Sequence, residues 1–250
     1  MSGHSKWKTI QHKKGAADAK RGKIFSKLSK EITIAAKMGG GDPELNPALR
    51  TIIAKAKAAN MPADNIERAI KKGTGELESA QLEEITYEGY IAGGVAIIVK
   101  VLTDNKNRAA SEIRHIFTKF GSNLAQQGSV IRNFKRKGQI LVNANTIDED
   151  TLMSIILEAG AEDMQKDDGM FEIITDPANF EKVLASLEKS GIKPENSEIT
   201  LIPDTYVPIT DKSVASNVMK FIEALEDNDD VQNVYTNVDI PEEILKQIEG

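Results

Sequence analysis

Hydrophobic and polar positions follow a helical period over the first part of the chain. From Lys20 to Lys37, lysines lie on one face of a helical wheel and apolar residues on the opposite face. The lysine face holds Lys20, Lys23, Lys27, Lys30 and Lys37, and the apolar face holds Ile24, Phe25, Leu28, Ile32, Ala35 and Ala36. Arg21 is the exception, because it falls on the apolar side. The pattern predicts one amphipathic helix with a core-facing side and a cationic stripe.

Two shorter helices are predicted next. Gly39–Gly41 ends the first helix, and Asn46-Pro47 opens the second with a capping residue and a proline suited to the first helical position. Pro62 begins the third helix, and Gly73 is its predicted stop. The three helices predict a small basic domain over residues 1–75, followed by a polar, glycine-containing linker at 73–84.

Beyond residue 84 the pattern becomes that of strands alternating with helices. Residues 85–102 predict two strands around a Gly93-Gly94 turn, and the polar residues 104–107 offer N-caps for a helix that runs to Phe120. Residues 129–136 predict a further strand. The order strand–helix–strand–strand–helix–strand is predicted for residues 139–202. A strand at 204–209, a helix at 211–226, a strand at 231–236 and a short helix from Pro241 follow.

The predicted fold class is therefore α+β and multidomain. A three-helix N-terminal domain precedes two α/β ferredoxin-like domains, one inserted in the other. Residues 138–202 form the inserted domain, and residues 76–137 with 203–250 form the discontinuous one. This division follows because each half of the discontinuous domain alone would leave open sheet edges.

Charge is distributed unevenly along the 250 residues. The net charge is −6, but residues 1–80 carry 16 Lys/Arg against 8 Asp/Glu, whereas residues 81–250 carry 16 against 30. A net charge of +8 is thus followed by one of −14. A basic head on an acidic body indicates an anionic partner bound at one end.

The basic residues concentrate in the first 30 positions, which hold nine Lys/Arg and one acid, Asp18. The single tryptophan lies between two of these lysines, which suits base stacking with phosphate contacts alongside. A solvated lysine face, and a tryptophan that folds back as a hydrophobic anchor, are the alternatives. The candidate nucleic-acid-binding residues from this pattern are Lys6, Trp7, Lys8, His12, Lys13, Lys14, Lys20, Arg21, Lys23, Lys27 and Lys30.

The composition excludes several kinds of chemistry. With no cysteine, the chain has no disulfide, cysteine zinc site, iron–sulfur cluster or catalytic thiol. No apolar run approaches the roughly 20 residues of a membrane helix, and no secretory signal follows Met1. Gly39–Gly41 follows a helix and lacks the Gly-Lys-Ser/Thr ending of a phosphate-binding loop. We expect a soluble, cytoplasmic protein that uses no cofactor or metal.

Three further groups of polar residues are weaker candidates for function. Asp104, Asn105, Asn107 and Arg108 suit a helix cap better than a phosphate or ribose contact. A second small basic patch comprises Arg132, Lys135, Arg136 and Lys137. An acidic cluster comprises Glu223, Glu226, Asp227, Asp229 and Asp230, which we interpret as a solvated helix end or as a contact for a basic protein surface. The cluster lacks calcium-loop spacing, because Gln232 stands where that loop needs glycine.

Several segments together resemble one family. The segments GHSKW, AADAKRGKIFSKL, GGGDPELNP, ITYEGY, GGVAIIVKVLTDNKNR, FTKFGSNL and LEDNDDVQNVYTN run in order along the chain, which is similar to the YebC family from end to end. Members of that family are called probable transcriptional regulators, and a mitochondrial relative activates translation. The resemblance implies three domains and nucleic-acid binding, and adds His4 and Ser5 to the candidate residues.

The sequence therefore predicts a non-enzymatic regulator of gene expression that binds nucleic-acid phosphates through its N-terminal segment. DNA binding in transcription is the first interpretation, and an RNA- or ribosome-binding translation factor is the alternative. An enzyme with an acidic cleft between the α/β domains and a protein–protein adaptor are further alternatives. Lysine outnumbers arginine eight to one in the first 30 residues, so we expect contacts with the backbone more than with base edges. We expect a monomer, because no dimerisation stripe is evident.

Overall fold

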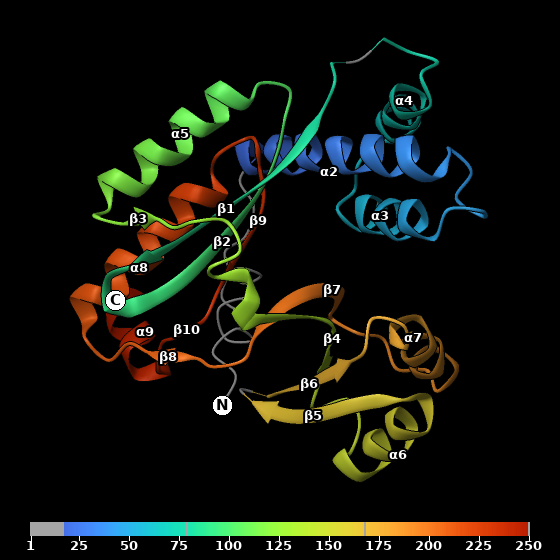
Figure 1. Cartoon of the computed structure of the whole chain (residues 1–250). Coiled ribbons are helices and arrows are strands. Elements are labelled where there is room, and N and C mark those ends of the chain that lie inside the picture. Colours follow the sequence, from blue (N-terminus) through green and yellow to red (C-terminus); the bar gives the residue numbers. More distant parts are fainter. Residues whose placement is uncertain (1–17, 79, 168, 250) are drawn as a thin grey trace.

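The computed structural model describes residues 18–78, 80–167 and 169–249. Three helices come first, and they lie beside a larger α/β unit whose two sheets are built from the rest of the chain (Figure 1). The mixed α+β class predicted from the sequence is confirmed.

The helical unit comprises α2 (Asp18–Gly39), α3 (Pro47–Ala58) and α4 (Ala63–Thr74). The apolar face predicted for α2 supplies much of its core, since Leu28, Ile32 and Ala36 are all buried. Ile24 departs from the pattern, with 41% of its surface exposed.

The connection between α2 and α3 is held by Asn46, as its predicted capping role requires. Its side-chain oxygen accepts from the Leu49 N–H, and its amide donates to the carbonyls of Ala35 and Gly40. Gly40 has φ +87°, a left-handed conformation that glycine adopts without steric cost. One buried side chain therefore closes the end of one helix and the start of the next.

The predicted stop of α4 is corrected by the structure. The helix continues through Gly73, and Gly75 provides the left-handed cap at φ 84°. A Cβ on Gly73 would lie 2.4 Å from the Thr33 carbonyl oxygen and 2.7 Å from the Ala36 Cβ. Gly73 is thus a point of close contact between α4 and α2.

The first sheet has the order β3-β1-β2-β9 and is antiparallel throughout. Its strands are β1 (Glu83–Ile91), β2 (Val95–Thr103), β3 (Asn123–Leu124) and β9 (Val231–Thr236). Helices α5 (Lys106–Lys119) and α8 (Lys212–Glu226) share one core with it, where the Phe117 and Phe221 rings meet edge to face at 5.0 Å. Helix α9 (Glu242–Glu249) packs on the same core.

The second sheet is built from the segment between β3 and α8. Its elements are β4 (Phe134–Asn143), α6 (Glu149–Ala159), β5 (Ala161–Asp167), β6 (Met170–Thr175), α7 (Phe180–Lys189) and β7 (Asn196–Pro203). The strand order β5-β6-β4-β7 is that of a ferredoxin-like unit, and α6 and α7 pack against one core with it. The Asp204 N–H donates to the Asn133 carbonyl at 2.8 Å, so the ends of this segment lie side by side.

Two predicted strands are only partly confirmed, because their bounds differ in the structure. Residues 131–133 form a 3-10 turn, and the strand begins at Phe134 and continues unbroken through Asn143. The cause is Glu88, whose buried carboxylate accepts from the N–H groups of Gly128, Val130 and Ile131 and so bends the preceding loop. The strand predicted at 204–209 shrinks to β8 (Val207–Pro208), which pairs with β10 (Val238–Asp239) outside the main sheets.

Candidate nucleic-acid interface

The predicted binding residues divide into three groups by what the structure describes. His4, Ser5, Lys6, Trp7, Lys8, His12, Lys13 and Lys14 lie outside the described residues. Lys20 and Arg21 belong to α2, but their side chains are not described. Lys23, Lys27 and Lys30 are described, and all three reach toward the end of α8.

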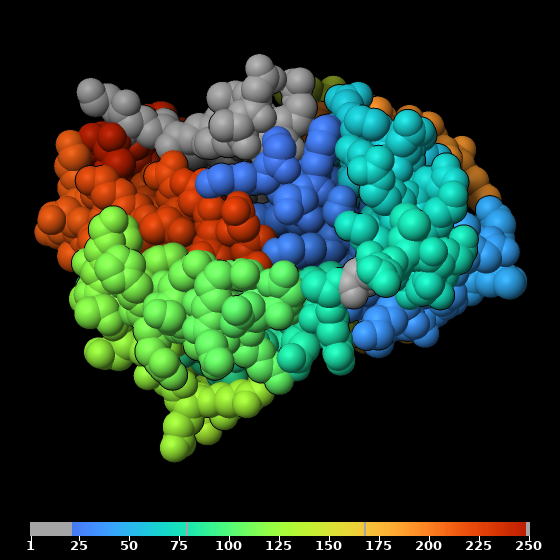
Figure 2. Space-filling view, turned by 90° about the horizontal axis from the view of Figure 1, so that it is seen from above, coloured from blue at the N-terminus to red at the C-terminus, as the bar shows by residue number. Residues whose placement is uncertain are grey.

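These three lysines donate to the last residue of α8, to the turn that follows it and to the end of β2. The Lys23 Nζ lies 2.9 Å from the Asp227 carbonyl and 3.3 Å from its Oδ1, and the Lys27 Nζ lies 2.6 Å from the Glu226 carbonyl. The Lys30 Nζ lies 3.0 Å from the Asp229 carbonyl, 3.2 Å from the Leu102 carbonyl and 2.7 Å from the Asp230 Oδ1. Lys23, Lys27 and Lys30 therefore contact the chain's own acidic cluster. Figure 2 shows the blue α2 against the orange-red end of α8.

The end of α8 needs donors from elsewhere for a general reason. The last carbonyls of a helix have no partner within it and carry partial negative charge. Basic side chains in the last turn can supply such donors, but α8 has none there. The lysines of α2 supply the cations from a different helix.

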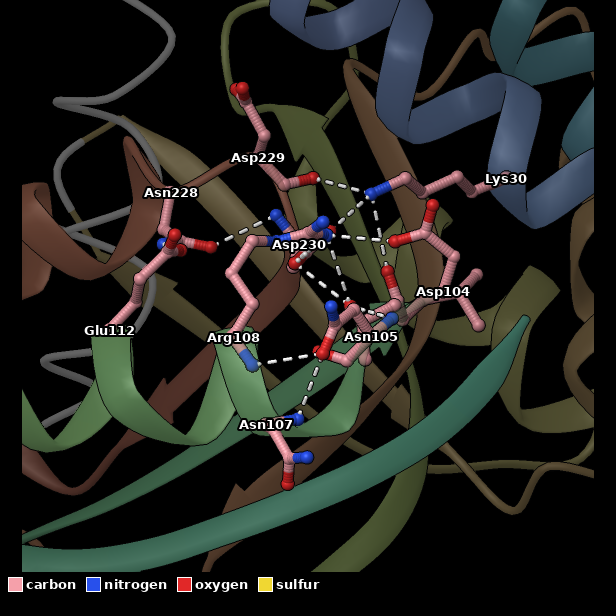
Figure 3. A network of polar contacts seen from close by, with 11 residues as sticks. Lys30, Asp104, Asn105, Asn107, Arg108, Glu112, Asn228, Asp229 and Asp230 are labelled. Atoms are coloured by element: carbon pink, nitrogen blue, oxygen red, sulfur yellow. Dashed lines mark hydrogen bonds and ion pairs between the residues drawn. The ribbon is translucent and has the colours of Figure 1, made fainter. Parts of the chain in front are cut away.

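Asp230 is the centre of this contact (Figure 3). Its Oδ1 accepts from Lys30, and its Oδ2 accepts from Arg108 at 2.8 Å and from Thr103 at 2.9 Å. The Lys30–Asp230 side chains are 20% and 5% exposed, whereas the Lys23–Asp227 pair is 41% and 59% exposed. Water screens the second pair far more, so we expect the first to contribute most of the docking energy.

The electrostatics of the contact follow from burial and pairing. Burial alone would raise the pKa of Asp230, but hydrogen bonds from Lys30, Arg108 and Thr103 hold that pKa below its usual value. Burial lowers the pKa of Lys27, although Glu226 opposes the shift. Hydrogen bonds to Asp230 and Asp104 raise the pKa of Arg108. Asp230 is therefore an ionised anchor for three different elements.

A second feature of α2 is a groove along its contact with α4 and the following connection. It encloses about 430 Å³. The lining comprises Phe25, Ser26, Ser29, Lys30, Thr33, Asn65, Arg68, Ala69, Lys72, Ala80 and Leu82. No Asp or Glu occurs among these lining residues, all of which belong to the described part of the chain.

The weaker candidates have structural roles. The Asn105 side chain accepts from the N–H groups of Asn107 and Arg108, so the predicted helix cap is confirmed. In the second basic patch, Lys135 pairs with Asp204 at 2.7 Å and Lys137 pairs with Glu162 at 2.6 Å. Both ammonium groups in that patch are thus matched by carboxylates.

The described residues contain neither a cluster of metal ligands nor a membrane-spanning helix. No three His, Asp or Glu side chains in ranges 18–78, 80–167 and 169–249 are grouped so that they could hold a metal ion. Of the helices in the same ranges, none combines the length and hydrophobicity of a membrane-spanning segment.

Two features are not predicted from the sequence. These are the contact of Lys23, Lys27 and Lys30 with the end of α8, and the groove between α2 and α4. The sequence predicts the acidic cluster as a solvated helix end or as a contact for a basic protein surface, and in the structure Lys23, Lys27 and Lys30 of the same chain contact it. The opposite charges of residues 1–80 and 81–250 were the available signal. Arg68 and Lys72 were overlooked because isolated cations on a short helix resemble ordinary surface.

Comparisons with known proteins agree along the whole chain. Residues 5–76 match a family model described as the TACO1/YebC protein N-terminal domain, and residues 82–238 match one described as the TACO1/YebC second and third domain. A "probable transcriptional regulatory protein" of Desulfatibacillum aliphaticivorans is 58% identical over 98% of this chain and 99% of its own length. One from Halothermothrix orenii is 55% identical, with 99% of each chain covered. A crystal structure of a conserved hypothetical protein from Aquifex aeolicus is 52% identical, with a TM-score of 0.84 over 94% of this chain and 97% of that one.

Proposed function

Because this chain belongs to the TACO1/YebC family, we propose that it is a non-enzymatic regulator of gene expression that acts by binding nucleic acid. The names of its full-length relatives support the regulatory role. The distribution of charge along the chain supports nucleic-acid binding as the means of regulation.

The main observation behind the proposal is that a basic N-terminal part, residues 1–80, precedes an acidic remainder, residues 81–250. Nine Lys/Arg and one acid occupy the first 30 residues, whereas residues 81–250 carry a net charge of −14. Electrostatic attraction to phosphates would therefore favour one end of the molecule.

The internal contacts of α2 suggest which basic residues would contact nucleic acid first. Lys23, Lys27 and Lys30 would have to exchange internal acceptors for phosphates before they could bind nucleic acid. We assign the first contacts to residues that precede them: His4, Ser5, Lys6, Trp7, Lys8, His12, Lys13, Lys14, Lys20 and Arg21.

Duplex DNA is the first candidate ligand because the relatives are named probable transcriptional regulatory proteins, and transcription takes place on duplex DNA. Lysine-led contacts favour the phosphate backbone, since lysine binds phosphate as a point charge. RNA, in translation, is the second candidate because Trp7 stands between two lysines. Such an arrangement suits stacking of an unpaired base on the indole, with the lysines beside its phosphates.

The proposal is tested with a 20-bp DNA duplex and a single-stranded 20-nucleotide RNA as probes. Replacing Lys6, Lys8, Lys13 and Lys14 by glutamine should flatten the log–log salt dependence of duplex binding by about 3–4, at about 0.9 per phosphate contact. The matched control replaces four exposed lysines of the acidic body: Lys182, Lys189, Lys193 and Lys212. No binding of either probe by the wild type would reject the proposal, and equal effects of the two sets would reject the assigned segment.

Trp7→Ala separates the two candidate ligands. Stacking contributes roughly 1–3 kcal/mol per unpaired base, so the RNA candidate predicts that single-stranded binding weakens about 5- to 150-fold. Duplex binding should change little in either case. Tight duplex binding with weak RNA binding that ignores the substitution would favour DNA.

A further inference from the structure

The groove between α2 and α4 is a cationic surface of the helical unit that has the shape of a site. Its volume of about 430 Å³ is within the roughly 300–1,000 Å³ typical of ligand pockets. Its walls come from α2 and α4, which run side by side in the helical unit (Figure 1), and α2 also carries Lys20 and Arg21 of the proposed nucleic-acid segment.

The helical spacing explains why its polar groups converge. Ser26, Ser29 and Thr33 recur at three- and four-residue intervals along one side of α2, and Asn65, Arg68 and Lys72 do so along α4. The two helices are tied together by Thr33, whose Oγ1 donates to the Ala69 carbonyl at 3.1 Å, and by the close approach at Gly73. The lining is therefore held on rigid elements.

The chemistry of the lining matches an anion with several acceptor oxygens. It offers a guanidinium, hydroxyls and an amide, with no carboxylate among its described members. The Lys30 ammonium donates to Asp230, and the other two cationic side chains of the lining are Arg68 and Lys72. Glu67, the acid next to Arg68, pairs with Lys71 at 2.6 Å. A planar guanidinium is well suited to phosphate oxygens.

We infer that this groove binds a phosphodiester of the nucleic acid, with Arg68 and Lys72 as its phosphate contacts. The inference rests on the proposed function and extends the binding surface beyond the N-terminal segment. Ser26 lies six positions after Lys20, which is about 9 Å along a helix at 1.5 Å per residue. That distance corresponds to two or three nucleotides at 3.4 Å each, so one strand can reach both places.

The first test removes the two cations. Arg68→Gln with Lys72→Gln should flatten the salt dependence of binding by about 1.8 on the DNA duplex, or by about 1.4 on single-stranded RNA. The charge-matched control is Arg50→Gln with Lys57→Gln, two exposed residues of α3 outside the groove. An unchanged slope for the groove variant, or equal flattening in the control, would overturn the inference.

The absence of cysteine allows a second, independent test. A single thiol introduced as Ser26→Cys lies in the groove wall, and Ser190→Cys lies on the exposed end of α7. Saturating RNA or duplex should slow alkylation of the first thiol at least several-fold and leave the second unchanged. If the wild type binds a probe but the groove thiol is not protected, the groove assignment fails while the proposed function stands. If neither probe binds, the proposed function fails and the groove assignment fails with it.

Discussion

At the scale of the residue, Glu88 shows how one buried carboxylate directs a distant loop. Its side chain accepts from Gly128 and Val130 at 2.6 Å each and from Ile131 at 2.9 Å. Burial alone would raise the pKa of Glu88, but the three N–H groups hold it below its usual value. Folding is therefore favoured by the ionised form of this group.

The consequence is a pH-dependent contribution to stability. Glu88→Gln should lower the free energy of unfolding at pH 7 by about 1.5–3 kcal/mol, the range for hydrogen bonds to charged groups. Because the folded pKa is depressed, the wild type holds this contribution above about pH 4.5 and loses it as the pH falls further. Urea unfolding between pH 7 and pH 3 should show the two proteins converging at acid pH.

Glu31 on α2 provides a control of opposite sign. Burial raises the pKa of Glu31, with Lys55 opposing the shift and Glu198 adding to it. Ionised Glu31 thus opposes folding at neutral pH, and Glu31→Gln should stabilise the protein there and lose that advantage as the pH falls. Destabilisation by both variants at pH 7 would contradict this account.

At the scale of the element, two glycines inside helices should respond oppositely to alanine. Alanine is the better helix former by about 1 kcal/mol, and a Cβ on Gly22 of α2 would meet nothing within 4 Å. Gly22→Ala should therefore stabilise α2. Gly73→Ala places a methyl group 2.4 Å from the Thr33 carbonyl, and overpacking of this kind costs roughly 1–3 kcal/mol.

Thermal and urea unfolding followed by helical circular dichroism measure both effects. Gly73→Ala should lower the midpoint, whereas Gly22→Ala should raise it. A rise in both would mean that α2 and α4 can separate without loss, and that Gly73 is not a packing contact.

Features that depend on neighbouring residues were predictable from the sequence, whereas features that depend on distant residues were not. Helix boundaries at Asn46 and Asn105 were predicted because capping depends on residues only two or three positions away. The strand at 129–136 was mispredicted because its path depends on Glu88, about 40 residues earlier. The basic candidate residues were recognised from composition, but the acceptors of Lys23, Lys27 and Lys30 lie some 200 residues away. The groove depends on how α2 and α4 pack, which local periodicity does not determine.

At the scale of the whole molecule, the segment from Phe134 to Pro203 should be separable. It has its own core, and its ends meet where Asp204 donates to Asn133. One glycine between Asn133 and Asp204 would span about 7.6 Å in two steps of 3.8 Å, more than the about 5.5 Å between hydrogen-bonded strand partners. We expect both pieces to fold when expressed separately.

The separated pieces should differ in stability. Removal of the segment uncovers Ala96, Ile98 and Tyr235, which pack against Phe134 and Leu201 in the intact chain. The remainder should show the circular dichroism expected of its own helices and strands. It should unfold at a lower urea concentration than the intact protein. A 134–203 fragment without cooperative unfolding would show that this unit depends on its host.

The attachment of α2 to the end of α8 also bears on how this chain can vary through evolution. Four of the described acceptors are main-chain carbonyls, those of Leu102, Glu226, Asp227 and Asp229, and every amino acid supplies one. Drift at positions 226 and 229 should therefore leave the attachment intact, provided that the turn keeps its path. Position 230 differs, because its carboxylate accepts hydrogen bonds from both Lys30 and Arg108. Among homologues we expect residues 30, 108 and 230 to change only in concert, while residue 229, which Lys30 contacts at its carbonyl, varies more.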